Sequence, residues 1–340
     1  MSIFSLHLSP YSPDAGFKQE GYYIWCGSVI REEGNGLYHL FASRWKAELP
    51  FHPGWLIGSE VVRAVSESVC GPYRFAEVVL PPRGAEYWDG RMTHNPRILK
   101  CGKKYVLFYT GSTHPFELPD GGISLTNQDA ATIVARANKR IGIAVSDSLY
   151  GPWTRFERPV LDTKPGTFYS FLTSNPSPLV ETDGSIYLIF KSRAYEGSVH
   201  GRMYLGAARA EAYDAPFRVI TPEPFHFGEV EDPFVWHDDR EYRMIAKDIT
   251  GRIGGIPADG IGAYSSDGLV WKTTGPVYRR SGTDKFGIEH AFALMERPFL
   301  YRENGSCRAF FAAVSPEFPY LPGKRVQTWI SAWDAQLQLI

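Results

Sequence analysis

Five side chains that can carry a proton or a negative charge are the candidates for chemistry in this sequence. They are Asp89, Glu231, Asp232, His290 and Glu296. General acid–base catalysis needs two groups whose pKa values are pushed apart, one that donates a proton and one that activates water. A glutamate donor needs a pKa raised by burial or by a neighbouring carboxylate, whereas a histidine needs little shift. Glu231 and Asp232 cannot be acid and base together, because successive strand residues point to opposite faces.

Each of these residues also has a structural interpretation. Asp232 could accept backbone N–H groups at the start of a strand, and Asp89 could cap its own loop. Glu296 could pair with the adjacent Arg297, and an isolated histidine such as His290 is often only a hydrogen-bonded loop residue. The sequence leaves both interpretations open.

A second group of residues has the chemistry expected of ligand binding. It consists of Arg44, Trp45, Trp88, His94, Asn95, Asn175, Lys191, Arg193, Lys247 and Arg297. The two asparagines can form hydrogen bonds but cannot transfer protons near neutral pH, and a Trp beside an acid suits stacking on a sugar. The excess of Lys and Arg suits a carboxylate, sulfate or phosphate, although these cations could instead neutralise nearby acids.

An internal repeat predicts the elements that position these residues. Hairpin-like segments begin near Trp25, His94, Ser174, Glu231 and Glu296, each with a short β-rich run, a polar turn and a second β-rich run. A second pair of strands follows, as in "KRIGIAVSDSLYGPWTRF". Five units of four antiparallel strands predict an all-β, five-bladed β-propeller that occupies residues 1–340 as one domain. A two-sheet β-sandwich would not repeat the same unit five times.

The fifth unit is incomplete in sequence order. The run "RVQTWISAW" supplies its third strand, and either residues 335–340 or residues 3–8 could supply the outer one. Because the strands alternate in direction, short turns gather on one face and long loops on the other. Long loops in a compact domain are usually functional, so we place the site on the long-loop face, at the mouth of the central cavity.

Composition excludes several classes of protein. The 340 residues carry a formal net charge of −1, which argues against a nucleic-acid binder that relies on positive charge. Four widely spaced cysteines without a CxxC pair suggest neither a zinc site nor a disulfide framework. No basic leader followed by an apolar run and no 18-residue apolar stretch occurs, so we expect a cytoplasmic protein without a membrane partner. No ligand cluster requires a metal or another cofactor.

The hairpin openings "NP", "NP", "DP" and "RP", together with "SDGLVW" at Ser266–Trp271, resemble the five-bladed glycoside hydrolases of family 43 and their relatives in families 32, 117 and 130. The resemblance implies hydrolysis of a glycosidic bond in a pocket on the propeller axis, by acids of the innermost strands and usually with inversion. It also implies that a calcium ion on the axis is possible. Family 43 expects acids at the openings of blades one to three, where this chain has "WCGS", "HNPR" and "SNPS". Asp89, Asp232 and His290 could instead match the base, modulator and acid of family 117.

We therefore expect an exo-acting, inverting glycoside hydrolase whose partner is an oligosaccharide, and the basic residues make an anionic one plausible. Two alternatives stay open. Resemblance to family 130 implies a phosphorylase that uses phosphate as the nucleophile, and the missing acids at the first openings favour a propeller that only binds carbohydrate. The sequence does not indicate an oligomeric state.

Overall fold

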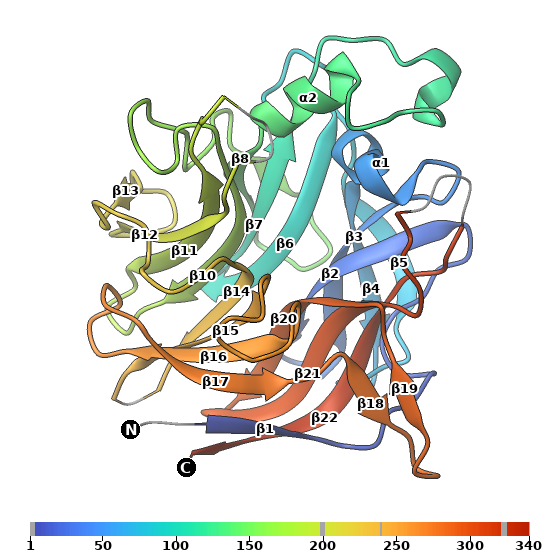
Figure 1. Ribbon diagram of the computed structural model, residues 1–340, viewed down its shortest axis with the longest axis vertical. Coiled ribbons are helices and arrows are strands. Elements are labelled where there is room, and N and C mark those ends of the chain that lie inside the picture. Colours follow the sequence, from blue (N-terminus) through green and yellow to red (C-terminus); the bar gives the residue numbers. More distant parts are fainter. Residues whose placement is uncertain (1–3, 198–200, 239, 321–324, 340) are drawn as a thin grey trace.

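Five four-stranded antiparallel sheets surround a common axis in the computed structural model, which describes residues 4–197, 201–238, 240–320 and 325–339 (Figure 1). Blade one contains β2 (Tyr22–Arg31), β3 (Tyr38–Lys46), β4 (Glu60–Ser66) and β5 (Arg74–Leu80). Blade two contains β6 (Met92–Cys101), β7 (Lys104–Ser112), β8 (Arg140–Ser146) and β9 (Thr154–Arg155). Blade three contains β10 (Leu172–Val180), β11 (Ile186–Arg193), β12 (Tyr204–Ala210) and β13 (Arg218–Val219).

The last two blades complete the ring. Blade four contains β14 (Val230–His237), β15 (Tyr242–Asp248), β16 (Gly260–Ser265) and β17 (Lys272–Tyr278). Blade five contains β20 (Leu294–Glu303), β21 (Ser306–Ser315), β22 (Trp329–Leu339) and β1 (Phe4–Leu8). Each innermost strand, namely β2, β6, β10, β14 or β20, contacts the innermost strands of both neighbouring blades. The predicted five-bladed propeller is therefore confirmed.

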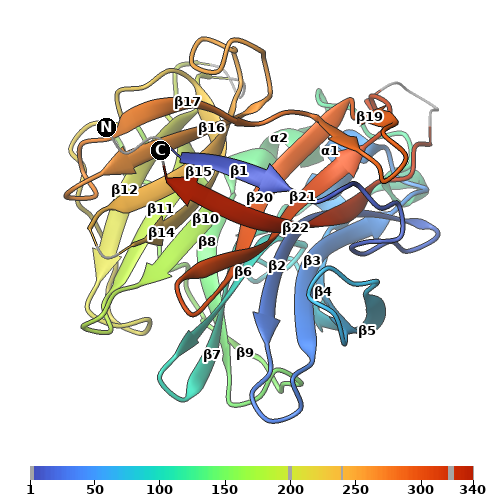
Figure 2. The ribbon, with the colours of Figure 1, turned by 90° about the horizontal axis from the view of Figure 1, so that it is seen from below.

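The outer strand of blade five comes from the N-terminal end of the chain. β1 pairs antiparallel with β22, from Phe4 opposite Leu339 to Leu8 opposite Ala335. Figure 2 shows the two strands side by side, with both chain ends at the same edge. Of the two segments that could have supplied this strand, the N-terminal one does so, because residues 335–339 continue the long third strand. The ring is thus closed by hydrogen bonds between the two ends of the described chain.

The long loops carry the helices, and these lie on one face of the ring. α1 (Phe51–Gly58) follows β3, and the short η1 (Pro119–Gly122) and α2 (Ala130–Ala137) follow β7. α1 and α2 contact each other, and Figure 1 shows them together at the same end of the blades. A small hairpin of β18 (Ser281–Thr283) and β19 (Glu289–Ala291) lies between blades four and five in the chain. None of the helices in the described part of the chain is long and apolar enough to cross a membrane.

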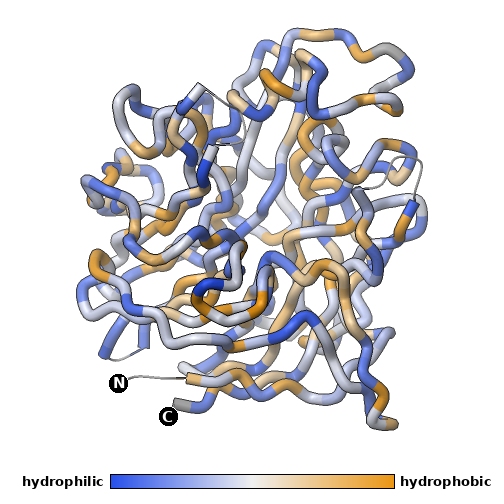
Figure 3. The backbone as a smooth tube through the Cα atoms, in the orientation of Figure 1, coloured by the Kyte–Doolittle hydropathy of each residue, from blue (hydrophilic) through white to orange (hydrophobic). Residues whose placement is uncertain are grey.

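Apolar side chains fill the spaces between neighbouring blades. Tyr23 of blade one packs with Phe311 and Ile330 of blade five, and Phe108 of blade two packs with Phe190 of blade three. Figure 3 shows apolar residues spread over all five blades instead of gathered in one place. Burying both faces of each sheet in this way supplies the main hydrophobic stabilisation of the ring, and it leaves the axis to polar residues.

Each innermost strand is interrupted by a bulge at the same place. The pairing register shifts just after Trp25, His94, Ser174, Glu231 and Glu296. The next residue has a left-handed backbone in every blade, with φ of 61° at Cys26, 56° at Asn95, 50° at Asn175, 60° at Asp232 and 58° at Arg297. A bulge re-aims side chains and commonly does so beside functional sites. In four blades the residue after it is a proline, which needs no ladder hydrogen bond there.

Candidate active site

A cavity of about 250 Å³ lies on the propeller axis, on the face that carries α1 and α2. One part of its wall is aromatic, with Trp25, Trp45, Phe51, Trp55 and Tyr320. Another part is basic, with Arg136, Lys139, Lys191, Arg193, Lys247 and Arg297. Glu231 and Glu296 are the two carboxylates among its lining residues. This axial pocket thus combines flat apolar surfaces with cations and a pair of acids.

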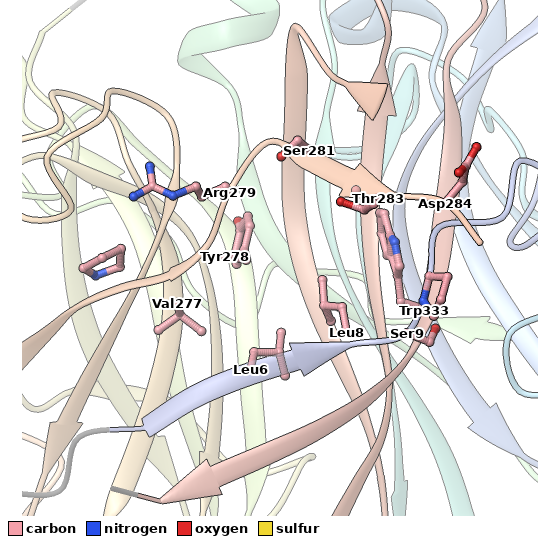
Figure 4. Close-up of a pocket in the computed structure, with 13 residues that line it drawn as sticks. Leu6, Leu8, Ser9, Val277, Tyr278, Arg279, Ser281, Thr283, Asp284 and Trp333 are labelled. Carbon is pink, nitrogen blue, oxygen red and sulfur yellow. The ribbon is translucent and has the colours of Figure 1, made fainter. Parts of the chain in front are cut away.

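A larger hollow of about 510 Å³ lies elsewhere, beside β1, β17 and β18 (Figure 4). Leu6, Leu8 and Trp333 contribute to its lining, and Asp284 is the one carboxylate among the residues that line it. Asp284 already binds His290. Since acid–base chemistry needs two groups in separate roles, the axial pocket is the better candidate.

The bulges decide which residues face the axial pocket. Trp25, His94, Glu231 and Glu296, each just before a bulge, all line it. The bulge residues themselves line a separate axial space of about 10 Å³. Equivalent positions of four blades therefore form the pocket wall, and the next positions form the floor beneath it, where Arg297 lines both spaces.

Glu231 is the most strongly paired carboxylate of the pocket. It binds Lys191 through Oε1, and its Oε2 lies 3.5 Å from Lys247 Nζ. Arg297 Nη2 is 3.9 Å from Oε1. Burial alone would raise the pKa of Glu231, but these three cations together hold it well below its usual range. Glu231 is therefore ionised at neutral pH and suited to the role of base or nucleophile.

Glu296 approaches the same lysine from the next blade. Its Oε1 lies 2.5 Å from Lys247 Nζ, and its side chain is 12% exposed. Burial lowers the pKa of Lys247, but the neighbouring Glu296, Glu231 and Asp232 outweigh burial and raise it. Lys247 therefore stays charged and bridges the two carboxylates of the pocket.

Asp232 lies beneath the pocket and not in it. Its carboxylate binds the Arg297 guanidinium, and it accepts hydrogen bonds from Asn175 Nδ2 at 2.7 Å and from the Arg297 backbone N–H at 3.2 Å. Burial raises the pKa of Asp232, against the opposing effect of Arg297. The side chain is not exposed, and the space beside it is too small for a sugar. This placement does not support the prediction that Asp232 is catalytic, because three donors on neighbouring blades bind it beside a space of only about 10 Å³.

Asp89 and Trp88 also lie outside the axial pocket. Asp89 is fully buried, pairs with Arg83 at 2.6 Å and Arg155 at 3.3 Å, and accepts a hydrogen bond from Tyr109 Oη at 2.7 Å. Trp88 stacks on Tyr109 with ring centroids 5.7 Å apart. The structure does not bring this pair to the axial pocket, because the pair joins the loop before β6 to the other strands of blade two.

His290 and Arg44 are the other predicted residues that the structure places elsewhere. His290 lies in β19, where Nε2 is 2.9 Å from Asp284 Oδ2 and the ring packs on Tyr11. Arg44 pairs with Glu60 at 2.8 Å and does not line the pocket. Both side chains have local partners, so the acid role suggested for His290 and the binding role suggested for Arg44 are not supported.

The remaining predicted binding residues divide between the pocket and its floor. Trp45, His94, Lys191, Arg193, Lys247 and Arg297 line the pocket, whereas Asn95 and Asn175 line the small space beneath it. His94 Nδ1 is 2.8 Å from Ser59 Oγ, and its Nε2 is 3.4 Å from Cys26 Sγ. Burial, helped by nearby cations, lowers the pKa of His94 well below its usual value, so the ring is neutral.

Several pocket residues were not among the predicted site residues. Trp55 and Phe51 come from α1, and Arg136 comes from α2. These helices fold within the long loops after β3 and β7, and those loops were expected to wall the site. Loop length was therefore the available signal, but it could not indicate which loop residues turn inward.

A calcium ion does not fit the residues on the axis. Asp232 is the one carboxylate that lines the axial space, and the Arg297 guanidinium already occupies it. Calcium takes six to eight oxygen ligands. Over the described ranges, no cluster of three or more His, Cys, Asp or Glu residues could hold a metal ion.

Solved structures with the same fold include several glycoside hydrolases. A family 117 glycoside hydrolase from the marine bacterium Zobellia galactanivorans superimposes with a TM-score of 0.67 at 17% identity, over 98% of this chain and 91% of that one. The catalytic domain of a family 62 α-L-arabinofuranosidase from Coprinopsis cinerea gives 0.60 at 13% identity, over 97% of both chains. A thermostable family 43 glycoside hydrolase gives 0.60 at 12% identity, over 95% and 92%. No protein-family model and no curated protein sequence matches the chain. At these identities the likeness establishes the propeller fold.

Proposed function

We propose that this protein is a glycoside hydrolase that binds a terminal sugar in the axial pocket, with Glu231 and Glu296 as its carboxylate pair. One observation carries the proposal: two acids from adjacent blades meet at Lys247 inside a pocket with tryptophan walls. Glycoside hydrolysis requires two carboxyl groups that flank the scissile bond. The shared fold with glycoside hydrolases of families 117, 43 and 62 supports this choice.

The two glutamates differ in their surroundings, and this difference supports the roles that we propose for them. Glu231 has three cations within 4.0 Å, which keep it ionised. It is therefore the proposed carboxylate that either attacks the sugar or activates water. Glu296 has Lys247 as its one cation within that distance in the described structure. Glu296, which has fewer cationic partners than Glu231, is therefore the proposed proton donor to the leaving oxygen.

Their spacing bears on stereochemistry. One oxygen of each carboxylate lies within 3.5 Å of the same Nζ, so these two oxygens are closer together than the roughly 6.5–9.5 Å typical of an inverting pair. The inversion implied by resemblance requires the pair to separate when substrate binds. Without such a movement, the spacing favours retention through a glycosyl–enzyme intermediate on Glu231.

The size of the pocket supports exo action. A volume of about 250 Å³ is below the roughly 300–1,000 Å³ of sites for larger small molecules, and it suits a single sugar ring. Trp45 and Trp55 offer flat surfaces for that ring, and α1 and α2 narrow the opening. A chain end fits this arrangement better than the middle of a polysaccharide.

The test is sugar release from a panel of neutral and acidic oligosaccharides by the native protein and by the Glu231→Gln and Glu296→Gln variants. Each variant should lose about 10²–10⁴-fold in kcat while it stays folded, and Asp89→Asn is the control that keeps activity. Proton NMR of the first anomer released separates retention from inversion. Full activity in both glutamine variants would remove this site from consideration.

The basic wall also favours a second candidate, phosphorolysis, in which phosphate replaces water as the nucleophile. Turnover with and without inorganic phosphate distinguishes the two reactions, because only a phosphorylase forms a sugar phosphate. Binding of sugars without any turnover would instead support a propeller that binds carbohydrate and does not cleave it.

A further inference from the structure

We propose that Arg136 and Lys139 form an oxyanion subsite in the axial pocket, which binds the carboxylate or sulfate group of an acidic sugar. The identification of the ligand as a sugar rests on the proposed function. The subsite itself rests on the balance of charge, the burial and the hydrogen-bond partners of the basic wall.

Among the described residues, more cations than carboxylates line the pocket. Six cations and two carboxylates line it. The carboxylates bind Lys191, Lys247 and Arg297. Among the residues that the structure describes, no carboxylate lies within 4.0 Å of Arg136 or Lys139. The positive charge of Arg136 and Lys139 is therefore not paired with a carboxylate of the described chain.

Side chains other than carboxylates hold the two cations in place. Arg136 Nη2 donates to Asn127 Oδ1 at 3.3 Å and lies 3.2 Å from His52 Nε2. Lys139 Nζ lies 5.1 Å from the centre of the Trp55 ring. These contacts orient the guanidinium and the ammonium group without cancelling their charge. An arginine has five N–H donors, so others are available to a planar oxyanion.

Both residues are nearly inaccessible to bulk water. Lys139 is 3% exposed and Arg136 is 6% exposed. Burial, together with the neighbouring Lys191, Arg136 and Arg193, lowers the pKa of Lys139 well below its usual value. Burial and Arg193 lower the pKa of Arg136 to about 10. Buried like charges are costly, and an anion between them would relieve that cost.

The subsite belongs to the sugar that meets the carboxylate pair. Glu231, Lys139 and Arg136 line the same cavity of about 250 Å³, and the charge of Glu231 partly offsets the lowering of the pKa of both cations. Lys191, which binds Glu231, also acts on Lys139. The acidic group is therefore carried by the terminal sugar itself and not by a distant part of the chain.

Calorimetry on the native protein tests the proposal with matched pairs of monosaccharides: galacturonate, galactose 6-sulfate and galactose, and glucuronate with glucose. At least one acid should bind at least 10-fold more tightly than its neutral partner, with an affinity that falls as salt increases. Lys139→Gln and Arg136→Gln should each remove at least 10-fold of that affinity, a larger loss than the same variant shows for the neutral sugar. Lys139→Arg, which keeps the charge, should retain most of it.

Arg140, the next residue along the chain and the first of β8, provides a matched control. Arg140 pairs with Asp162 at the surface, and its Nη1 donates to the backbone carbonyls of Ala137 and Lys139. Arg140→Gln removes the same kind of charge one residue away, so it should leave binding of the acidic sugar unchanged. Circular dichroism of each variant confirms that it is folded.

The outcomes separate the subsite from the hydrolase. Equal affinity for acidic and neutral sugars, or acid binding that survives both glutamine variants, overturns the subsite even if neutral glycosides are cleaved. Acid binding that depends on Lys139 and Arg136 supports the subsite even if nothing is cleaved. If inorganic phosphate binds in a way that depends on Lys139 and Arg136 but no acidic sugar does, the oxyanion site stands. The proposal that an acidic sugar carries the oxyanion is then overturned.

Discussion

Oε1 of Glu296 lies 2.5 Å from Nζ of Lys247, across the boundary between blades five and four. The same ammonium group is 3.5 Å from Glu231 Oε2. A single side chain from the second strand of blade four therefore determines how far apart the two acids of the pocket lie. The propeller supplies the acids from two innermost strands, and Lys247 couples them.

Replacing Lys247 with methionine should reduce both stability and activity. The change leaves two buried carboxylates without the cation they share, and removing one partner of a buried ion pair costs about 3–5 kcal/mol of unfolding free energy. Urea unfolding measures this loss, and kcat measured well below the unfolding midpoint reports the effect on the site. A variant as stable and active as the native protein would show that the bridge does not exist in solution.

The pH dependence of stability should report the ionised state of Glu231. Its pKa is lower in the folded protein than the unfolded value of about 4.3. The stabilisation is therefore fully present above about pH 4.3 and is lost as the pH falls through the folded pKa. The difference in unfolding free energy between the native protein and Glu231→Gln should stay constant from about pH 7 to pH 5 and shrink toward pH 3. A difference that is independent of pH over this range would contradict the ion pairs around Glu231.

Asp232 should behave as a structural residue. Asp232→Ala leaves the Arg297 guanidinium buried without its carboxylate, which should cost about 3–5 kcal/mol. Asp232→Asn should be milder, because Asn tolerates the left-handed backbone at φ 60° and can still accept one hydrogen bond. Chemical denaturation of both variants gives the two costs. If the alanine variant is as stable as the native protein but inactive, Asp232 is catalytic after all.

Asp89 allows a similar separation of stability from activity. Asp89→Asn weakens the bonds to Arg83 and Arg155 in a fully buried position, so it should lower the unfolding free energy. Since Asp89 does not line the pocket, kcat per folded molecule should stay within about twofold of the native value, against the 10²–10⁴-fold expected for a lost acid or base. A loss of kcat in that larger range, with stability unchanged, would return Asp89 to the site.

The sequence predicts the blades well because the two strands and the turn of each hairpin follow one another directly in the chain. The polar turns and β-rich runs are local signals, and the equivalence of Trp25, His94, Glu231 and Glu296 follows once the repeat is aligned. That alignment correctly brings Glu231, Glu296 and Lys247 to one cavity. It does not indicate the bulge, which sends the neighbouring Asp232 beneath the pocket instead of into it.

Predictions that depended on loops were less successful. Asp89 and His290 lie in connections whose partners are set by packing, namely Arg155 on the outer strand of blade two and Asp284 at the end of the small hairpin. Arg136 lines the pocket because α2 folds inside the long loop after β7, and the lengths of the loops at this position differ between blades. Such contacts form only when the ring has folded, so neither the repeat nor a motif predicts them.

Lys139 provides a final prediction that links stability to binding. Its pKa is lower in the folded protein than the unfolded value of about 10.4. Between these two pKa values the folded state therefore binds fewer protons than the unfolded chain. The charged Lys139 therefore lowers the free energy of unfolding, and this loss is largest below the folded pKa. The loss shrinks as the pH rises from the folded pKa to the unfolded one. Lys139→Gln should raise the unfolding free energy at pH 7 by about 0.5–2 kcal/mol, and the gain should fade toward pH 10.

Urea unfolding of the native protein, Lys139→Gln and the control Arg140→Gln at pH 7 and pH 10 checks this prediction. A saturating acidic monosaccharide should reverse the order at pH 7, because a ligand that binds only the folded native protein adds to its stability. A lysine that merely supports the fold would give the opposite result, with Lys139→Gln less stable at pH 7 whether or not the sugar is present. An anion-binding role for Lys139 predicts that its charge lowers the free energy of unfolding of the free protein and increases the affinity for the acidic sugar.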